Sequence, residues 1–407
     1  MRIIPRKNIS VSLPEFKAFI RSVKRGEVIN GEDIEKFEKR FSEYIGVKYS
    51  IAVASARSGI WATLKAFGCE KGEKIIMCSY NLPAIVSLIE RMGLRPVFVD
   101  MEPDTYNIDV AKIEEHIDKD TKYILATHMF SQPCELDSIK RIAKKYNMKV
   151  IEDCAHACGS EFSGSKAGSF GDAGCFSFDI GKALVAFGGG MVTTNDRELY
   201  LKIKDIVSEF RTPEKSGTIK HILLDFIMAF FTKRIPFGIF AFPASFLCVA
   251  AGHDLEDLVD GITGVDDLKY NPERSLKFSN AQAAIGIEQL KKLDHINDLR
   301  IRNSNILSEN LKSLKGLKIS NTRKNTKNIH LYYPLEAGEV HKLKRCLMLR
   351  GIDSKITAQT GCVFDSARQA AGPGKNNVME LPNGYALDSR DMDYIVKTIK
   401  GFAEKSV

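Results

Sequence analysis

The sequence predicts an α/β fold: a large domain with a mainly parallel sheet between helices, followed by a smaller C-terminal α+β domain. In the first half, short apolar runs alternate with helix-like segments, which is typical of βαβ units and a parallel sheet. The tail from about residue 328 mixes the strand-like segment IHLYYPL with helical segments. We therefore expect a large domain over 1–209, an apolar insertion over 210–270, and a long helix with the small domain over 271–407.

The predicted strands are short apolar runs bounded by polar or turn-forming residues, at 74–79, 95–101, 122–129, 148–153, 175–178 and 191–194. Apolar residues recur at helical spacing in 16–23, 34–41 and 135–146, and the stretch 278–311 has the pattern of one long amphipathic helix. Ligands of parallel sheets bind at the carboxyl ends of the strands, which makes Asp153 a candidate site residue.

The composition indicates an ordinary globular protein and limits the classes of partner that it could bind. Hydrophobic residues make up 44% of the 407, enough to bury a large core. The net charge of +8 is mild, and without a long Lys/Arg block we expect no nucleic-acid partner. Nine cysteines lack a paired framework and the N-terminus lacks the apolar core of a signal peptide, so we expect a cytoplasmic protein.

The insertion contains two apolar runs. The first, 219–231, is a helix candidate. The second, 235–252, is short for a membrane span, and its two prolines disfavour a regular helix. Two interpretations stay open: a lid or dimer contact, or a patch at 219–251 that makes a peripheral contact with the inner face of the membrane.

The segment VIEDCAHACGS (150–160) places Asp153 at a strand end and His156 between Cys154 and Cys158. The C-x-H-x-C spacing offers three metal donors without a second cluster, and cysteine is common in buried positions, so we predict no metal site. Two interpretations remain. The carboxylate serves a cofactor, or Asp153 caps a helix and His156 is a structural, half-buried histidine.

The loop between the last two predicted strands carries Lys182, followed by three consecutive glycines at 188–190. Apolar neighbours on both sides of Lys182 would desolvate its ammonium, which lowers a lysine pKa and favours Schiff-base chemistry. The glycines allow the backbone to approach a planar ligand closely. The alternative is an ordinary solvated lysine.

The stretch VASARSGIWATLKAF (53–67) begins like a strand and reaches Arg57-Ser58 before a predicted helix. A helix N-terminus with a hydroxyl and a guanidinium suits a phosphate, although a serine cap alone would also explain it. Pyridoxal phosphate needs a phosphate cradle, a lysine, and a carboxylate that keeps its ring nitrogen protonated. Arg57-Ser58, Lys182 and Asp153 could supply these three roles.

The chain resembles the DegT/DnrJ/StrS-type sugar aminotransferases, which are fold-type-I pyridoxal phosphate enzymes with a seven-stranded sheet. The resemblance covers about 10–205 and 275–300. Its motifs, in the family's order, are GEVINGEDIEKFEKRFSEYIGVKY, RPVFVDMEPDTYNID, VIEDCAHACGS, GSFGDAGCFSFDIGK, GGGMVTTND and AQAAIGIEQLKKLD. It implies that Lys182 forms the Schiff base and Asp153 holds the ring nitrogen. By the same resemblance His156 lies against the ring, and Ser177 joins Arg57-Ser58 at the phosphate.

The chain departs from the family pattern at several positions, and the first is the phosphate motif, which is commonly SGT and reads Arg57-Ser58-Gly59 here. Leu82 stands where an aromatic residue often stacks on the cofactor, and Ser275 stands where a neighbouring subunit contributes an asparagine. Gly188 replaces a glutamate in the loop after the lysine. These departures leave the cofactor assignment intact and leave the sugar substrate open.

The resemblance implies an aminotransferase that moves an amino group from glutamate, or another amino acid, to a keto sugar. We expect this sugar to be nucleotide-linked, in polysaccharide or secondary-metabolite biosynthesis, and the protein to be a homodimer. Two alternatives stay open: another pyridoxal phosphate enzyme, such as a sugar dehydratase or an amino-acid transaminase, and a non-catalytic pyridoxal phosphate-binding regulatory protein.

Overall fold

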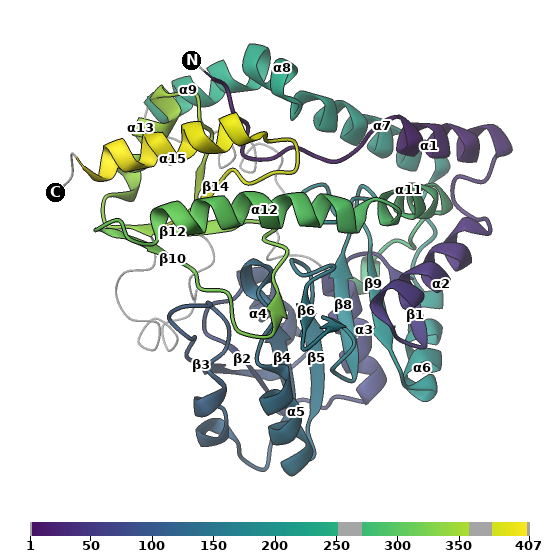
Figure 1. Ribbon diagram of the computed structural model, residues 1–407. Coiled ribbons are helices and arrows are strands. Elements are labelled where there is room, and N and C mark those ends of the chain that lie inside the picture. Colours follow the sequence, from purple (N-terminus) through teal and green to yellow (C-terminus); the bar gives the residue numbers. More distant parts are fainter. Residues whose placement is uncertain (1, 251–270, 358–376, 405–407) are drawn as a thin grey trace.

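The computed structural model describes residues 2–250, 271–357 and 377–404. Its centre is a seven-stranded sheet in the order β1-β9-β8-β5-β4-β2-β3 (Figure 1). Within this sheet β9 is the one antiparallel strand, so the other six point in the same direction. The predicted α/β class is confirmed, and each of the six predicted strands overlaps one observed strand. The strands are β1 (Tyr49–Val53), β2 (Lys74–Cys78), β3 (Arg95–Val99), β4 (Thr121–Thr127), β5 (Lys149–Asp153), β8 (Ala173–Ser177) and β9 (Gly190–Thr194).

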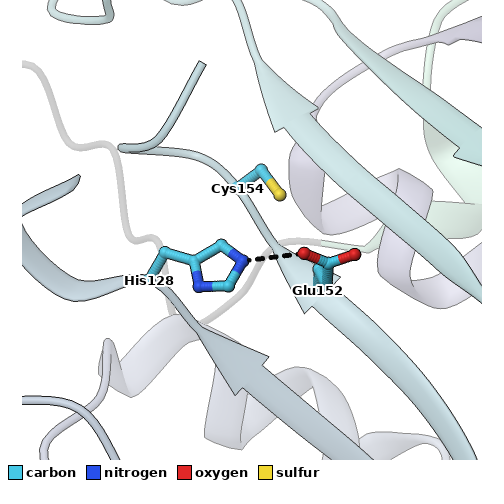
Figure 2. Close-up of side chains that lie close together, drawn as sticks. All are labelled: His128, Glu152 and Cys154. Carbon is cyan, nitrogen blue, oxygen red and sulfur yellow. Dashed lines mark hydrogen bonds and ion pairs between the residues drawn. The ribbon is translucent and has the colours of Figure 1, made fainter. Parts of the chain in front are cut away.

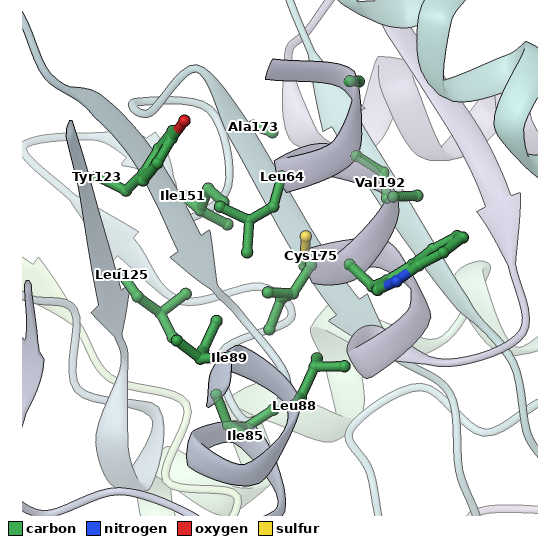
Figure 3. Close-up of a cluster of buried hydrophobic side chains, with 14 of the residues drawn as sticks. Leu64, Ile85, Leu88, Ile89, Tyr123, Leu125, Ile151, Ala173, Cys175 and Val192 are labelled. Carbon is green, nitrogen blue, oxygen red and sulfur yellow. The ribbon is translucent and has the colours of Figure 1, made fainter. Parts of the chain in front are cut away.

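Helices cover both faces of this sheet. Helices α3, α4 and α6 bury one face, whereas α2, α5 and α11 bury the other. Figure 3 shows part of the first cluster, where Leu64 and Leu88 of two helices meet Leu125 and Ile151 of the sheet. Burying a side chain of this size contributes about 1.5–3 kcal/mol. The helices here are α1 (Leu13–Arg25), α2 (Asp33–Ile45), α3 (Ala56–Phe67), α4 (Pro83–Arg91), α5 (Leu136–Lys145) and α6 (Arg197–Ser208).

The stretch 278–311 forms two helices, α11 (Asn280–Leu290) and α12 (Leu293–Leu311), so the prediction of one long helix is wrong. Lys292 leaves helical geometry between them, with φ −116° and ψ 1°. Its ammonium is held by the Ser10 carbonyl at 2.5 Å and by the buried Glu15 carboxylate at 2.6 Å. The break lets α11 pack against the large sheet while α12 crosses to the second one (Figure 1).

A second, four-stranded sheet in the order β10-β12-β14-β13 forms the core of the C-terminal part. It packs with α12, α13 and α15. The chain's first residues also lie here, since Ile4 pairs with Ile352 in a β-bridge and Arg6 forms an ion pair with Glu380. A small sheet, β11-β6-β7, joins the two parts. Their bounds are β6 (Glu161–Phe162), β7 (Ser165–Lys166), β10 (Leu317–Ile319), β11 (Thr326–Lys327), β12 (Tyr333–Ala337), β13 (Lys355–Ile356), β14 (Val378–Leu381), α13 (Val340–Leu349) and α15 (Ser389–Ala403).

The described part of the insertion is helical and lies across the top of Figure 1. It comprises α7 (Lys215–Phe231), α8 (Arg234–Pro236), a π-helix (Phe237–Ala241) and α9 (Phe242–Ala250), whereas 251–270 lies outside the described residues. The predicted helix at 219–231 corresponds to α7, and the proline-containing run follows it with a π-helical irregularity. Among the described residues, no helix combines the length and apolar character needed to cross a membrane.

Candidate functional site

A cavity of about 920 Å³ opens at the carboxyl ends of the parallel strands. Its wall is built from residues that directly follow β1, β2, β4, β5 and β8, because these strands all point toward it. Ligands of parallel sheets bind at this edge. The structure brings seven predicted site residues together in the wall: Arg57, Leu82, Asp153, His156, Ser177, Lys182 and Ser275.

Asp153 is the last residue of β5 and is 7% exposed. Its Oδ1 accepts a hydrogen bond from the backbone N–H of Ala155 at 3.0 Å. Burial raises the pKa of the Asp153 carboxyl, and this effect outweighs the Ala155 hydrogen bond and the charge of Lys182, which both lower it. A cationic group in the cavity would relieve the cost of burying this carboxylate.

Lys182 lies half-buried in the loop between β8 and β9. Its backbone N–H donates to the Asp179 carbonyl at 3.0 Å, and the Tyr332 hydroxyl donates to the Gly181 carbonyl at 3.0 Å. Burial lowers the pKa of the Lys182 ammonium, although the Asp179 and Asp153 carboxylates oppose the shift. A lowered pKa increases the fraction of neutral amine, which is the form that acts as nucleophile or base.

His156 follows Asp153 by three residues and is held on two sides. Its backbone carbonyl accepts from Ser131 Oγ at 2.6 Å, and its ring lies edge-on to the Tyr332 ring at 5.2 Å. Burial lowers the pKa of His156 well below its usual value, and the charge of Lys182 lowers it further. The ring is therefore neutral near pH 7 and meets a ligand as a polar, uncharged surface.

The N-terminus of α3 forms the wall beside these groups, one turn earlier than the sequence suggested. Ser55 is the N-cap: its Oγ accepts from the Ser58 N–H at 3.1 Å, and Ser58 Oγ accepts from the Ser55 N–H at 2.8 Å. This reciprocal capping box buries Ser58, so the structure does not place its hydroxyl at the cavity. Ser55, Ala56 and Arg57 line the cavity instead, at a helix end that favours anions.

Gly190 allows the close packing at this helix end. A Cβ at Gly190 would lie 2.3 Å from the Phe176 carbonyl oxygen and 2.9 Å from the Ala56 backbone nitrogen. Both contacts are shorter than side chains tolerate, and the backbone atoms cannot move aside. The third glycine of the loop is therefore required for β9 to lie directly against the start of α3.

The remaining predicted residues have different surroundings. Leu82, 43% exposed, caps α4 and gives the cavity an apolar wall. Ser177 ends β8. Ser275, which the resemblance implies for a neighbouring subunit, lines the cavity of its own chain just before α11.

Several cavity residues were missed by the sequence analysis, including Asn81 and His128. Asn81 follows β2 and donates from Nδ2 to Thr127 Oγ1 at 3.1 Å. His128 directly follows β4, and its N–H donates to the Asp153 carbonyl at 3.1 Å. The rule that singled out Asp153, a polar residue after a buried strand, would have found both.

His128, Glu152 and Cys154 also form the one group of three potential metal ligands among the described residues (Figure 2). Two of its side chains, His128 and Glu152, already have hydrogen-bond partners within the protein. His128 Nδ1 accepts from the Cys134 N–H at 3.1 Å, which leaves the proton on Nε2 to donate to Glu152 at 3.0 Å. Burial raises the pKa of the Cys154 thiol well above its usual value, so it is a poor metal ligand. The cluster is therefore a structural hydrogen-bond network.

The cavity residues fit pyridoxal phosphate on three observations. The start of α3 offers a place for a phosphate, the desolvated Asp153 carboxylate offers a partner for a protonated ring nitrogen, and Lys182 offers an amine. Asp153 and Lys182 line the same cavity, so one ligand could meet both groups. The volume is large enough for a cofactor together with part of a second molecule.

Comparisons with known proteins agree with this assignment. Residues 12–223 and 264–400 match the sequence model of the DegT/DnrJ/EryC1/StrS aminotransferase family. An uncharacterized protein of Methanocaldococcus jannaschii is 32% identical over 79% of this chain and 76% of its own length. A dTDP-3-amino-3,6-dideoxy-alpha-D-galactopyranose transaminase of Aneurinibacillus thermoaerophilus is 44% identical, over 45% of this chain and 51% of its own length.

A solved structure shows the same fold. The crystal structure of an aminotransferase from Streptoalloteichus hindustanus superposes with a TM-score of 0.78 at 20% identity, and the match covers 100% of both chains. The family predicted from the sequence is confirmed by the match over most of the chain. The chain therefore belongs to the DegT/DnrJ/EryC1/StrS aminotransferase family.

Proposed function

We propose that this protein is a pyridoxal phosphate-dependent aminotransferase that moves an amino group from glutamate, or a similar amino acid, to a keto group of a nucleotide-linked sugar. The observation that carries the proposal is the meeting of Lys182, Asp153 and the start of α3 in one cavity. The sugar class is supported by the dTDP-sugar transaminase to which the chain is similar. Polysaccharide or secondary-metabolite biosynthesis is the setting such a product fits.

Each group has a distinct task. The start of α3, at Ala56 and Arg57, would hold the phosphate, and Ser177 would add a hydroxyl. Asp153 would keep the ring nitrogen protonated, and His156 would lie beside the ring as a neutral side chain. Pyridoxal phosphate, when bound, supplies a carbonyl that exchanges amino groups and a ring that accepts electrons from a substrate carbon.

Lys182 is the residue proposed to act on the substrate. In its neutral form, favoured by burial, its Nζ can take a proton from the donor's α-carbon and later return one. The Asp179 and Asp153 carboxylates keep this amine from becoming a permanently neutral group, because both favour its protonated form. Lys182 can therefore alternate between base and acid.

The first test measures the visible absorbance of the cofactor in purified protein, before and after L-glutamate is added. Wild type should bind pyridoxal phosphate with a yellow colour that glutamate bleaches. Lys182→Ala should lose this response, whereas Lys202→Ala, an exposed lysine on α6, should keep it. A glutamate response that persists in Lys182→Ala would contradict the proposed role.

Product analysis separates this proposal from its alternatives. With glutamate and a nucleotide-linked keto sugar, an aminotransferase yields an amino sugar and 2-oxoglutarate in equal amounts. A dehydratase would instead yield a dehydrated sugar and no amino sugar. A non-catalytic regulatory protein would bind the cofactor and give neither product.

We further propose that the insertion contacts an anionic lipid surface. Helices α7 to α9 expose large apolar side chains, and α1 lies beside α7, since Phe16 packs edge-on against Phe226 at 5.3 Å. We call this surface the apolar patch; its residues are Leu13, Phe16, Leu223, Leu224, Ile227, Met228, Phe230, Ile235, Ile239, Phe240 and Leu247. An exposed apolar surface of this extent usually marks an interaction site.

The charges on and near the apolar patch favour a lipid surface over a second copy of the chain as its binding partner. The segment 226–248 contains no acidic residue. Two of the helices that carry the patch, α1 and α7, also carry exposed basic side chains: Lys17, Arg21, Lys24 and Lys220. An apolar face flanked by basic residues is typical of helices that lie in the interface of an anionic membrane.

Flotation with vesicles tests the lipid contact. Wild type should float with phosphatidylglycerol-containing vesicles and not with neutral ones. A triple variant, Ile239→Ser, Phe240→Ser and Leu247→Ser, should stay in solution, whereas Leu201→Ser, an exposed leucine on α6, should float like wild type. Light scattering tests whether the protein is a homodimer. If wild type does not float and the triple variant loses the dimer, the apolar patch is the subunit contact instead.

A further inference from the structure

The turn that follows β4 has a strained backbone. Phe130 and Ser131 are consecutive and buried, and both lie in the left-handed region, with φ values of 48° and 68°. Residues other than glycine rarely adopt this conformation, because their Cβ comes too close to the following carbonyl oxygen. Backbone strain of this kind concentrates near functional sites. The turn begins at Met129, which lines the large cavity, so the strained residues lie at the edge of the candidate site.

Ser131 bridges two segments that are far apart in the sequence. Its Oγ donates to the His156 carbonyl at 2.6 Å and accepts from the Leu331 N–H at 3.0 Å. Ser131 is 0% exposed, so removing its hydroxyl would take a partner from two backbone groups that water does not readily replace. A glycine would adopt the left-handed backbone more easily, but it could make neither bond. The hydroxyl is therefore the feature that serine contributes at this position.

Tyr332 comes next in the chain after this bridge and contacts the proposed site. Its ring lies edge-on to the His156 ring at 5.2 Å, and its hydroxyl donates to the Gly181 carbonyl at 3.0 Å. Gly181 directly precedes Lys182. The Ser131 hydroxyl therefore fixes the backbone of His156 and the backbone next to Tyr332. These two side chains contact each other, and one of them contacts the Lys182 loop.

Ser160 reinforces the same junction. Its Oγ donates to the Ser131 carbonyl at 2.7 Å and accepts from the Ile329 N–H at 3.4 Å, and the residue is also 0% exposed. The two serines thus join the large domain to the segment between β11 and β12 at two points. Of the two, Ser131 is the one bonded to His156.

We propose that Ser131 is a positioning residue for amino transfer, which holds His156 and Tyr332 in the arrangement that the cofactor and the Lys182 loop require. This role rests on the proposed function, because His156 and Lys182 have their tasks only if pyridoxal phosphate binds in the large cavity. Ser131 does not line that cavity, so it acts through these neighbours. Small displacements of a group beside the reacting atoms slow a reaction steeply, which is why such supporting contacts matter.

Three variants test this role. Ser131→Gly deletes the hydroxyl and relieves the strained backbone, so it should fold. Ser131→Ala deletes the same hydroxyl but keeps the Cβ, and it should lower the Tm more than Ser131→Gly does. Ser160→Ala is the matched control, because it deletes an equally buried hydroxyl of the same junction that is not bonded to His156.

The main readout is the induced circular dichroism of bound pyridoxal phosphate at saturating cofactor, which reports how the ring is oriented in its asymmetric site. Both Ser131 variants should lose most of this signal, whatever the difference in their Tm. Their kcat should fall by about tenfold to a hundredfold, with the KM for glutamate little changed. Ser160→Ala should keep the wild-type signal and kcat, even if its Tm is lower.

The positioning role is overturned if the Ser131 variants keep the wild-type dichroism and kcat. It is also overturned if Ser160→Ala loses both equally, because a loss common to the junction is a matter of stability. Should thermal melting show that Ser131→Ala is unfolded, Ser131→Gly decides. A wild type without any cofactor signal would contradict the proposed function, and this role with it, whereas unchanged Ser131 variants beside an active wild type would contradict the positioning role alone.

Discussion

Glu152 and Asp153 are neighbours on β5, and their side chains leave the strand in opposite directions into two very different regions. Glu152 points into a closed pocket where its two oxygens accept four hydrogen bonds, from His128 and from the backbone N–H groups of Gly168, Phe170 and Gly171. Asp153 points into the large cavity and accepts one, from Ala155.

The pKa shifts follow this difference. Burial raises the pKa of both carboxyls, but at Glu152 the hydrogen bonds from His128 and the backbone outweigh burial, so the net shift is downward. At Asp153 burial wins and the net shift is upward. A buried carboxylate with all its acceptors used is structural, whereas one left short of donors is poised to bind a ligand. Substitutions at these two residues test the contrast, and a further pair tests the start of α3.

The largest effect is expected on activity at Asp153. Asp153→Asn keeps the size of the side chain and an acceptor for Ala155, but removes the charge that would keep the ring nitrogen protonated. We expect amino transfer to fall about 10²–10³-fold, the scale for losing one electrostatic contact in a transition state. Steady-state kinetics with saturating cofactor measure this. An activity within a factor of three of wild type would mean that Asp153 has no electronic role.

The next largest effect is expected on stability at Glu152. Glu152→Gln places an amide N–H₂ against backbone N–H donors, so buried donors face each other. The free energy of unfolding should fall by about 3 kcal/mol, as for a broken buried pair. Urea denaturation measures it, with the exposed Glu198→Gln on α6 as the control. Equal urea midpoints for Glu152→Gln and Glu198→Gln would mean that Glu152 has no structural role, and its contrast with Asp153 would be lost.

A smaller effect is expected at Ser58, where sequence and structure disagree. Ser58→Ala removes half of the capping box of α3 and should cost about 1 kcal/mol of stability, with cofactor affinity unchanged. Arg57→Ala, in the cavity wall, should weaken cofactor binding with less effect on stability. Fluorescence titration and thermal melting separate the two. If Ser58→Ala loses cofactor affinity, the Ser58 hydroxyl contacts the phosphate, as the sequence predicted.

The sheet, and the places of Asp153 and Lys182 in the cavity wall, could be predicted because they depend on local patterns: short apolar runs, a polar residue at a strand end, and a lysine before glycines. The error at Ser58 has a local cause too, since two serines three residues apart leave the helix start ambiguous. The pairing of His128 with Glu152 needs the register of β4 on β5, which places Thr127 opposite Asp153.

The smallest effect is expected on stability at Asp153. Removing this carboxylate should stabilise the protein, whereas removing the Glu152 carboxylate should destabilise it. The folded pKa of Asp153 lies above its unfolded value, so its ionisation costs stability once the pH exceeds the unfolded pKa of about 3.9. Asp153→Asn should therefore raise the Tm of cofactor-free protein at pH 7 and leave it unchanged near pH 3. Glu152 has a lowered folded pKa, so its contribution is lost as the pH falls through that value, and Glu152→Gln should lack this loss. Melting curves between pH 3 and pH 7 test both signs; a lower Tm for Asp153→Asn at pH 7 would show that its carboxylate already has a stabilising partner within the protein.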